Sequence, residues 1–161
     1  MKKQWFACLL SGLLFVTFLS CSSDDTQWRD ENIAYMGKIA KQEGIKQLGD
    51  SINGFSGIYY QVLRSGDTTT ARPVIGNVVR TVYKCYLYND TTAFDSNDNY
   101  KSTVGKSIDG FDIALQYMHV GDYWKLYIPY NLAYGTSGTT SVPAYSMLVY
   151  YIYLKEIVSE N

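Results

Sequence analysis

The sequence has no excess of basic residues, because 14 lysines and arginines stand against 15 acidic residues and the net charge is −1. Nucleic-acid binding needs a clustered excess of Lys and Arg, so nucleic acid is excluded as a default partner. Charged residues are also few, at 18%, whereas apolar residues make up 47% of the 161 positions. This composition excludes a disordered or collagen-like chain and predicts one globular domain.

Histidine and cysteine are scarce: His119 is the single histidine, and there are three cysteines. We find no Ser-His-Asp set, no metal-ligand cluster and no phosphate-binding glycine loop, so we expect neither a metal nor a cofactor. We expect His119 in a turn between a helix and a strand, without a catalytic role. Cys85 is the one cysteine of the expected mature domain, so it has no partner for a disulfide and is predicted to be a reduced, buried strand residue.

The sequence also lacks an apolar run long enough to cross a bilayer, which takes about 20 residues in a helix. Residues 5–19 are largely apolar, Lys2 and Lys3 precede them, and small residues follow. We therefore interpret residues 1–20 as a secretory signal peptide.

The end of this leader, Phe18-Leu19-Ser20-Cys21, resembles the lipobox of bacterial lipoproteins. The resemblance implies that Cys21 carries a lipid that attaches the protein to a membrane. The Asp24-Asp25 pair is similar to a signal that sends some Bacteroidetes lipoproteins to the cell surface. We expect a monomeric outer-membrane lipoprotein of the cell envelope, either periplasmic or surface-exposed.

Residues 21–50 are predicted to join the lipid to the domain. Residues 22–31 are polar and acidic and predict a tether. Ile33, Met36 and Ile39 recur at helical spacing, which predicts one short amphipathic helix between Asp30 and Lys46 that ends at Gly44. The domain itself is expected over residues 51–161.

Runs of β-branched and aromatic residues predict strands over residues 57–64, 78–88, 123–128 and 147–158. Two more short strands are expected near residues 93–95 and 101–104, after a turn at residues 89–92. The spacing of Phe111, Ala114, Leu115 and Met118 predicts one helix over residues 110–118. The predicted fold class is α+β, with an antiparallel β-sheet and one short α-helix.

Four blocks follow one another along this domain: SGIYYQVLRSGD, VYKCYLYNDTTAFDSN, GKSIDGFDIALQYMHVGDYWKLYIPYNLAYG and SVPAYSMLVYYIYLKEI. They resemble the opening strand, the F-D-S signature, the helix with its I-P-x-x-L-A-Y-G loop, and the closing strand of FKBP-type peptidyl-prolyl cis–trans isomerases. The resemblance covers residues 51–158 and implies a strongly twisted sheet wrapped on the helix. It also implies isomerisation of X-Pro bonds, with proline-containing peptides or unfolded exported proteins as partners.

The same resemblance implies a set of site residues. Phe111 is expected at the pocket floor under the proline ring, the Ile108 backbone N–H and the Tyr134 hydroxyl are expected to bind substrate carbonyls, and Cys21 is the lipid attachment site. The implied catalytic residues are Tyr83, Asp95, Ile108, Phe111 and Tyr134, and the implied substrate-binding residues are Phe94, Tyr100, Val142 and Tyr150.

Isomerisation needs no nucleophile. Rotation about a peptide bond crosses a barrier of about 18–20 kcal/mol because twisting removes amide resonance. A dry aromatic cleft favours the twisted amide, which is less polar than the planar one, and hydrogen bonds can hold it. Taken alone, the aromatic residues of the strands and the helix are better explained by core packing, whereas Tyr134 lies in a polar loop and favours function; the joint placement of all of them favours a cleft.

Two other functions stay open. The loop at residues 136–141 and the GKSIDG segment are shorter than their family counterparts, and Ser107 stands where an aliphatic residue is usual. These departures fit a weakly active or inactive peptide-binding or chaperone lipoprotein. The 16 tyrosines fit a surface glycan- or nutrient-binding lipoprotein that has reused the fold, and a row of exposed tyrosines would favour it.

Overall fold

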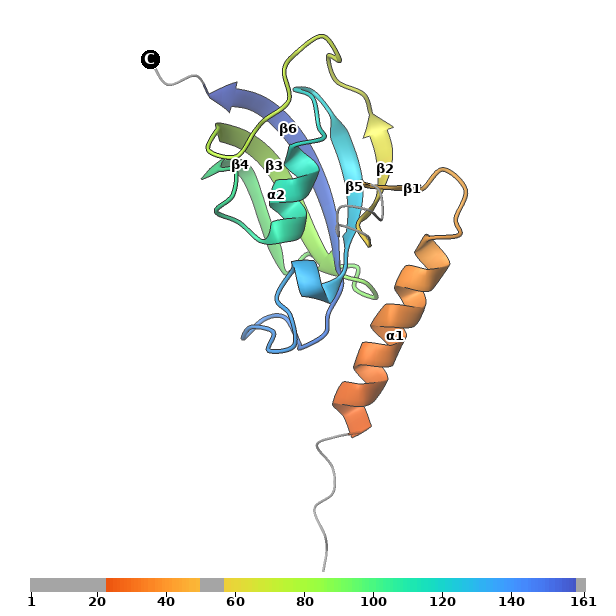
Figure 1. Cartoon of the computed structure of the whole chain (residues 1–161). Helices are drawn as coiled ribbons and strands as arrows, with labels where there is room; N and C mark the ends of the chain where they lie inside the picture. The colour runs from red at the N-terminus through yellow and green to blue at the C-terminus, as the bar shows by residue number, and fades with distance from the viewer. Residues whose placement is uncertain (1–22, 50–56, 159–161) are drawn as a thin grey trace, which may run out of the picture.

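A computed structural model describes residues 23–49 and 57–158 of the chain, shown in Figure 1. The predicted signal peptide, the lipid attachment site Cys21 and the expected start of the domain at residue 51 lie outside the described residues. Within the described residues, no helix has the length and apolar character needed to span a membrane.

The domain is built on one six-stranded sheet in which every neighbouring pair is antiparallel, in the order β1-β2-β5-β6-β3-β4. The strands are β1 (Lys46–Gln47), β2 (Tyr59–Arg64), β3 (Val78–Leu87), β4 (Asp95–Thr103), β5 (Tyr123–Ile128) and β6 (Leu148–Val158). The sheet curves around the short helix α2 (Asp109–Leu115), which lies against its inner face (Figure 1). This arrangement confirms the predicted α+β class.

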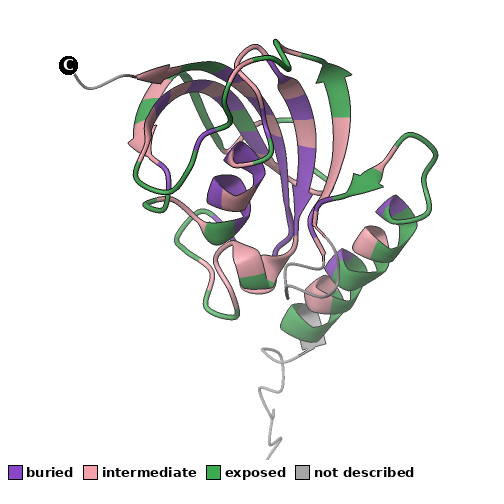
Figure 2. Cartoon of the chain, turned by 45° about the horizontal axis from the view of Figure 1, so that its top comes forward, coloured by how far each residue is buried: buried purple, intermediate pink, exposed green. Residues whose placement is uncertain are grey.

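The core lies between α2 and the inner face of the sheet, where alternate strand residues point inward. Ile152 and Leu154 of β6 and Leu126 of β5 are fully buried there, and Leu115 of α2 meets them in the same cluster. Figure 2 shows this buried band along the central strands and the inner side of α2. The core therefore fixes α2, and with it one wall of the site described below.

The first helix, α1 (Ser23–Ile39), lies on the outer face of the sheet rather than in the core (Figure 1). Its Ile39 packs in a second cluster with Tyr127 and Val149. The Asn32 side-chain oxygen accepts a 2.9 Å hydrogen bond from the Met147 N–H, and the Trp28 indole N–H donates a 3.0 Å bond to the Ser146 hydroxyl.

The N-terminal segment differs from its prediction. The helix begins at Ser23, seven residues before the predicted start at Asp30, so the segment predicted as a tether is helical from residue 23 onward. The spacing of apolar residues could not predict these first turns of the helix, because Trp28 and Asn32 contact the domain through hydrogen bonds and not through an apolar face. The strand β1, which was not predicted, follows the helix.

The strands predicted over residues 57–64, 78–88, 123–128 and 147–158 are confirmed to within two residues at each end. The two short strands predicted near residues 93–95 and 101–104 are wrong, because the chain forms one strand, β4, from Asp95 to Thr103. β4 is an edge strand with polar, largely exposed side chains, and its backbone pairing with β3 holds it. The predicted helix over residues 110–118 is confirmed but ends at Leu115, before a turn.

Candidate active site

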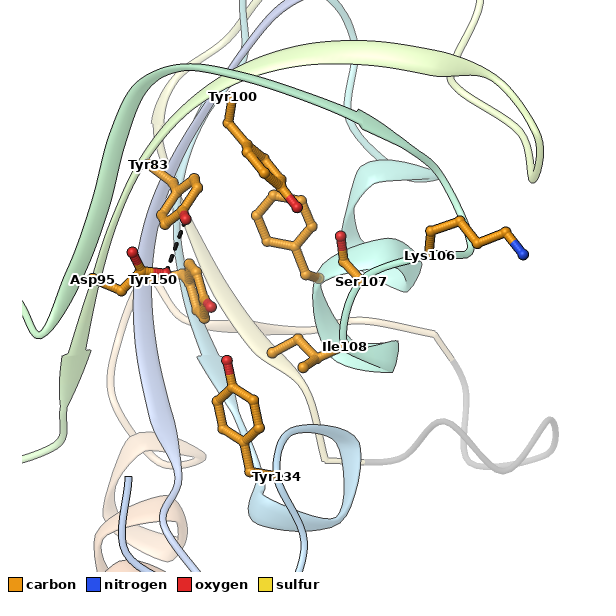
Figure 3. Close-up of a pocket in the computed structure, with 9 residues that line it drawn as sticks. Tyr83, Asp95, Tyr100, Lys106, Ser107, Ile108, Tyr134 and Tyr150 are labelled. Atoms are coloured by element: carbon orange, nitrogen blue, oxygen red, sulfur yellow. Dashed lines mark hydrogen bonds between the residues drawn. The ribbon is translucent and has the colours of Figure 1, made fainter. Parts of the chain in front are cut away.

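A cavity of about 330 Å³ opens between the inner face of the sheet, the start of α2 and the loop that joins β5 to β6. Seven of the nine implied site residues line it, and Lys106 and Ser107 complete it. The full lining is Tyr83, Asp95, Tyr100, Lys106, Ser107, Ile108, Phe111, Tyr134 and Tyr150, drawn in Figure 3.

Phe111 lies in the core of this lining, with 3% of its surface exposed. Its ring meets Tyr150 at 5.6 Å and Tyr83 at 6.0 Å between centroids, both edge to face. Aromatic rings favour this edge-to-face geometry, which stabilises the wall of the cavity. A proline ring that enters the cavity would meet an apolar, rigid surface.

Gly110 allows α2 to approach the sheet this closely. A Cβ atom at this position would lie 2.2 Å from Cγ2 of Ile128, which belongs to β5. Real Cβ atoms do not come this close to a neighbour, so a side chain here would force Ile128 or α2 to shift, and the glycine allows the close approach.

Tyr83 and Asp95 form one side of the cavity, from the paired strands β3 and β4. The Tyr83 hydroxyl donates a 2.9 Å hydrogen bond to a carboxylate oxygen of Asp95 (Figure 3). Burial raises the pKa of Tyr83, and the nearby Asp95 carboxylate raises it further. The phenol is therefore a neutral proton donor at physiological pH, and its proton is directed to Asp95.

Tyr134 reaches the cavity from the segment after the short 3-10 helix η2 (Tyr130–Leu132), and its hydroxyl points inward toward Tyr150 (Figure 3). Burial raises the pKa of Tyr134 and, more strongly, that of Tyr150. Among the residues drawn in Figure 3, the one hydrogen bond joins Tyr83 and Asp95, so it leaves the Tyr134 hydroxyl available for a ligand. Tyr134 is a neutral donor that faces the cavity.

Ile108 closes the opposite wall at the N-terminal end of α2. It has extended backbone angles (φ −66°, ψ 146°), and its carbonyl accepts the N–H groups of Phe111 and Asp112. The first N–H groups of a helix have no partner within the helix. The Ile108 N–H is such a donor, and the Ile108 side chain points into the cavity (Figure 3).

Asp112 supports this wall from behind. It is 6% exposed, and its carboxylate accepts a 2.8 Å hydrogen bond from the Ser107 N–H. Burial raises the pKa of Asp112, although backbone hydrogen bonds from Ser107 and Gly105 oppose the shift. The bond ties the segment before α2 to the helix itself, so Ile108 is held in place.

Two implied residues lie elsewhere. Phe94 and Val142 line a neighbouring pocket of about 290 Å³, which shares Asp95 and Tyr134 with the main cavity. In the loop before Val142, the Thr139 hydroxyl accepts the Val142 N–H at 3.1 Å, which turns the loop back on itself. Val142 is then buried at 2% exposure.

Lys106 was missed in the sequence, and Ser107 was noted there only as a departure from the family. Both belong to the GKSIDG segment, which stands out in the sequence as shorter than its family counterparts. That difference was the signal that could have pointed to these two residues. The Ser107 hydroxyl is buried and has no hydrogen-bond partner among the described residues. The Lys106 ammonium points away from the tyrosines (Figure 3).

His119 and Cys85 lie outside the cavity lining. The two His119 ring nitrogens are within hydrogen-bond distance of the Thr70 carbonyl, at 2.8 Å, and of Arg72, at 3.1 Å. Cys85 is fully buried in β3, and burial raises the pKa of its thiol. No cluster of metal-ligating side chains is present in the described part of the chain.

Comparison with known proteins identifies the family. The family model described as FKBP-type peptidyl-prolyl cis-trans isomerase matches residues 69–155. The chain belongs to this family. The resemblance read from the four sequence blocks is thereby confirmed, and members of the family act on proline-containing peptides and proteins.

Three curated relatives of this FKBP-type chain show how far the similarity extends. It is 32% identical to "Macrophage infectivity potentiator" of Trypanosoma cruzi, over 97% of this chain and 86% of the relative. It is 31% identical to FkpA of Aeromonas hydrophila, over 88% of this chain and 51% of the relative. It is 35% identical to the FKBP-type 22 kDa isomerase of Escherichia coli, over 80% of this chain and 60% of the relative. The chain thus spans about half to three fifths of the two bacterial isomerases.

Solved structures show the same FKBP-type fold. A peptidyl-prolyl cis-trans isomerase of Pseudomonas syringae matches with a TM-score of 0.72 and 26% identity, over 83% of this chain and 96% of that one. FkpA from Escherichia coli also matches with a TM-score of 0.72, at 28% identity, over 83% of this chain and 61% of that one.

Proposed function

We propose that this chain catalyses cis–trans isomerisation of X-Pro peptide bonds in the cavity floored by Phe111. The observation that supports it best is a cavity lined by aromatic rings into which the neutral Tyr134 hydroxyl points. The Ile108 N–H, at the N-terminal end of α2, is the second donor that we assign to the site. A proline ring would lie on Phe111, and the two donors would bind the carbonyls on either side of the twisting bond.

The rate increase comes from preferential binding of the twisted amide. The twisted state has lost conjugation and is less polar than the planar amide, so an aromatic cavity with little water stabilises it relative to the ground state. Each 1.36 kcal/mol of such preference speeds rotation about tenfold. Donors already in place at the carbonyl positions add to this preference, because they need no rearrangement during rotation.

Tyr83 and Asp95 take a supporting role in this proposal. Their 2.9 Å hydrogen bond directs the Tyr83 proton to Asp95 and holds the wall against which the proline ring packs. Tyr100 and Tyr150 complete the aromatic enclosure. The neighbouring pocket, which Phe94 lines and which shares Asp95 and Tyr134 with the main cavity, would take a further part of the peptide.

The experiment is the isomerisation rate of short X-Pro peptides with varied X, measured with the chain from Ser22 onward. Clear catalysis that a competing proline peptide inhibits is the expected result. A folded protein that binds proline peptides without catalysis would support the binding-module alternative instead. Loss of both binding and catalysis would contradict the proposal.

For its location, we propose that the protein is an envelope lipoprotein attached through Cys21, with residues 1–20 removed, residues 21–50 as the connecting segment and residues 51–161 as a monomeric domain. The apolar leader and the lipobox-like sequence support this proposal. The Cys21→Ser variant should leave the membrane fraction for the soluble fraction after cell lysis. A variant that still sediments with membranes would disprove lipid attachment at Cys21.

The glycan-binding alternative receives no support from the tyrosines. Of the 16 tyrosines, Tyr117 alone is exposed, and the others are buried or half-buried. The row of exposed tyrosines that would favour a glycan platform is therefore absent from the structure.

A further inference from the structure

A groove of about 460 Å³ lies on the outer face of the sheet, beside α1 and opposite the isomerase cavity. β3, β6 and β5 form its floor, Tyr35 of α1 forms one wall, and the turn between β3 and β4 forms another. The lining residues are Tyr35, Lys84, Tyr86, Leu87, Tyr88, Asp90, Thr91, Tyr123, Lys125, Val149 and Tyr151. None of them lines the isomerase cavity.

Strand register places two cations around one aromatic residue in this groove. Tyr151 of β6 lies opposite Lys84 of β3 on one side and Lys125 of β5 on the other. Directly opposite residues on one face of a sheet are close neighbours. A Lys–Tyr–Lys row therefore crosses the groove floor at right angles to the strands.

The tyrosine rings stand at angles to one another. Tyr86 and Tyr151 meet edge to face, at 78° and 5.7 Å, and Tyr123 is tilted by 38° against Tyr151. The Lys125 ammonium lies over the rings of Tyr127 and Tyr151, at 5.1 and 5.3 Å from their centroids. The floor is thus an uneven aromatic surface of tilted rings with phenol hydroxyls in the lining.

Lysines outnumber acidic residues in the groove lining by two to one, and the Glu31 carboxylate lies at the rim, where it accepts the Tyr88 hydroxyl at 2.8 Å. The charged lining residues are Lys84, Lys125 and Asp90. The ion pairs found among the described residues are Arg29–Asp30 and Arg80–Glu156, so neither lysine is neutralised by a salt bridge there. An anionic ligand would find two ammonium groups on either side of Tyr151.

From these features we propose that the groove is a second polypeptide site, which docks a proline-rich, acidic segment in the polyproline II conformation. Such segments bind aromatic-lined grooves in other proteins, because proline rings fit between aromatic side chains and the segment loses little entropy. Their carbonyls have no internal hydrogen bonds and need donors, which the phenols and ammonium groups supply. Acidic residues of the segment pair with Lys84 and Lys125.

The choice of a peptide rather than a sugar follows from the rings. A pyranose needs a flat aromatic platform to lie on, whereas Tyr86 and Tyr123 meet Tyr151 at 78° and 38°, so the rings of the groove floor form no such platform. An added β-strand is also excluded, because β3, β5 and β6 have strand neighbours on both sides. With a sugar and an added strand excluded, the groove fits a peptide segment that binds through its side chains and carbonyls.

This site deepens the proposed function, on which its benefit rests. A client docked on the outer face presents its neighbouring X-Pro bonds to the cavity at an effective concentration that reaches the millimolar range for a short flexible connection. The connecting chain must follow the surface to the opposite face, and half the circumference of a domain about 30 Å across is about 47 Å, or about 15 residues of polyproline II. A client chain with a connection of that length or more can occupy both sites.

The test is fluorescence anisotropy of the purified protein with three labelled nine-residue peptides: (Glu-Pro-Pro)₃, (Lys-Pro-Pro)₃ and (Glu-Gly-Ser)₃. The acidic proline-rich peptide should bind more tightly than either control, and more weakly as salt is raised. The double variant Lys84→Glu, Lys125→Glu should weaken this binding about tenfold or more, because two attractions become repulsions. The matched control Lys46→Glu, on β1, should bind like the wild type, and all three proteins should isomerise a short X-Pro peptide equally.

Three outcomes would overturn the proposal: equal binding of all three peptides, unchanged binding by a folded double variant, or displacement of the acidic peptide by a short X-Pro peptide that fills the cavity. Preferential binding of an acidic oligosaccharide such as oligogalacturonate would also overturn it. Binding is measured without catalysis, so a wild type that docks the peptide but isomerises nothing would refute the isomerase proposal alone.

Discussion

The Tyr134→Phe variant separates the hydrogen-bond donor from the aromatic wall. The hydroxyl faces the cavity, and no hydrogen bond to another residue of the lining uses it (Figure 3). Removing it should therefore cost the folded protein almost nothing, whereas the twisted amide loses one neutral hydrogen bond. Such a bond contributes about 0.5–1.5 kcal/mol net, which corresponds to a fall of about two- to thirteenfold in kcat/KM.

The assay follows cis–trans conversion of a short X-Pro peptide at saturating and limiting concentrations, with the melting temperature measured on the same samples. A fall in kcat with little change in KM is expected, since the bond is strongest in the twisted state. Tyr130→Phe is the matched control, because Tyr130 packs on Tyr145 at 5.3 Å and lies outside the cavity lining. Unchanged kcat/KM in Tyr134→Phe would remove Tyr134 from the mechanism, and a large drop in melting temperature would show that its hydroxyl is structural.

Three further predictions concern the cavity walls. Phe111→Ala should lower the free energy of unfolding by about 3–5 kcal/mol and abolish most activity, because it removes a buried ring that three tyrosines pack against. Denaturant titration measures the stability and the peptide assay measures the activity. A stable, active variant would contradict the assignment of Phe111 to the cavity floor. Gly110→Ala should destabilise by about 1–3 kcal/mol because its Cβ would overlap Ile128, and an unchanged denaturation midpoint would show that α2 can move away freely. The free energy of unfolding should fall as pH rises above 10.0, the ordinary tyrosine pKa, because Tyr150 and Tyr83 keep their protons to higher pH in the folded state than in the unfolded state. Tyr150→Phe should reduce the slope of the unfolding free energy against pH, and an identical slope would refute this cause.

The cleft was predictable from the sequence because its residues belong to short, continuous motifs. Phe111 is the third residue of α2, Tyr134 lies in the Ala-Tyr-Gly segment, and Tyr83 alternates with outward residues along β3, so each motif indicates the direction of its side chain. The core follows in the same way from strand alternation. The order of the strands and the helix along the chain was then enough to predict that the cleft residues come together.

Other parts depend on contacts that motifs do not encode. The polar residues between the two short strands predicted near residues 93–95 and 101–104 carry no strand signal, and pairing with β3 makes the whole segment one strand, β4. The start of α1 depends on Trp28 and Asn32, whose partners lie 118 and 115 residues away along the chain. The outer groove depends on the register that sets Lys84 and Lys125 beside Tyr151, and no single segment contains that register.

The burial of Cys85 makes its thiol a built-in probe of how often the sheet opens. The thiol has no exposed surface, lies opposite Asp95 of β4 and Tyr150 of β6, and keeps its proton because burial raises its pKa. A thiol reagent can react only after these three strands separate. In the chain from Ser22 onward Cys85 is the sole cysteine, so its labelling half-life reports how often the central sheet opens, without any added probe.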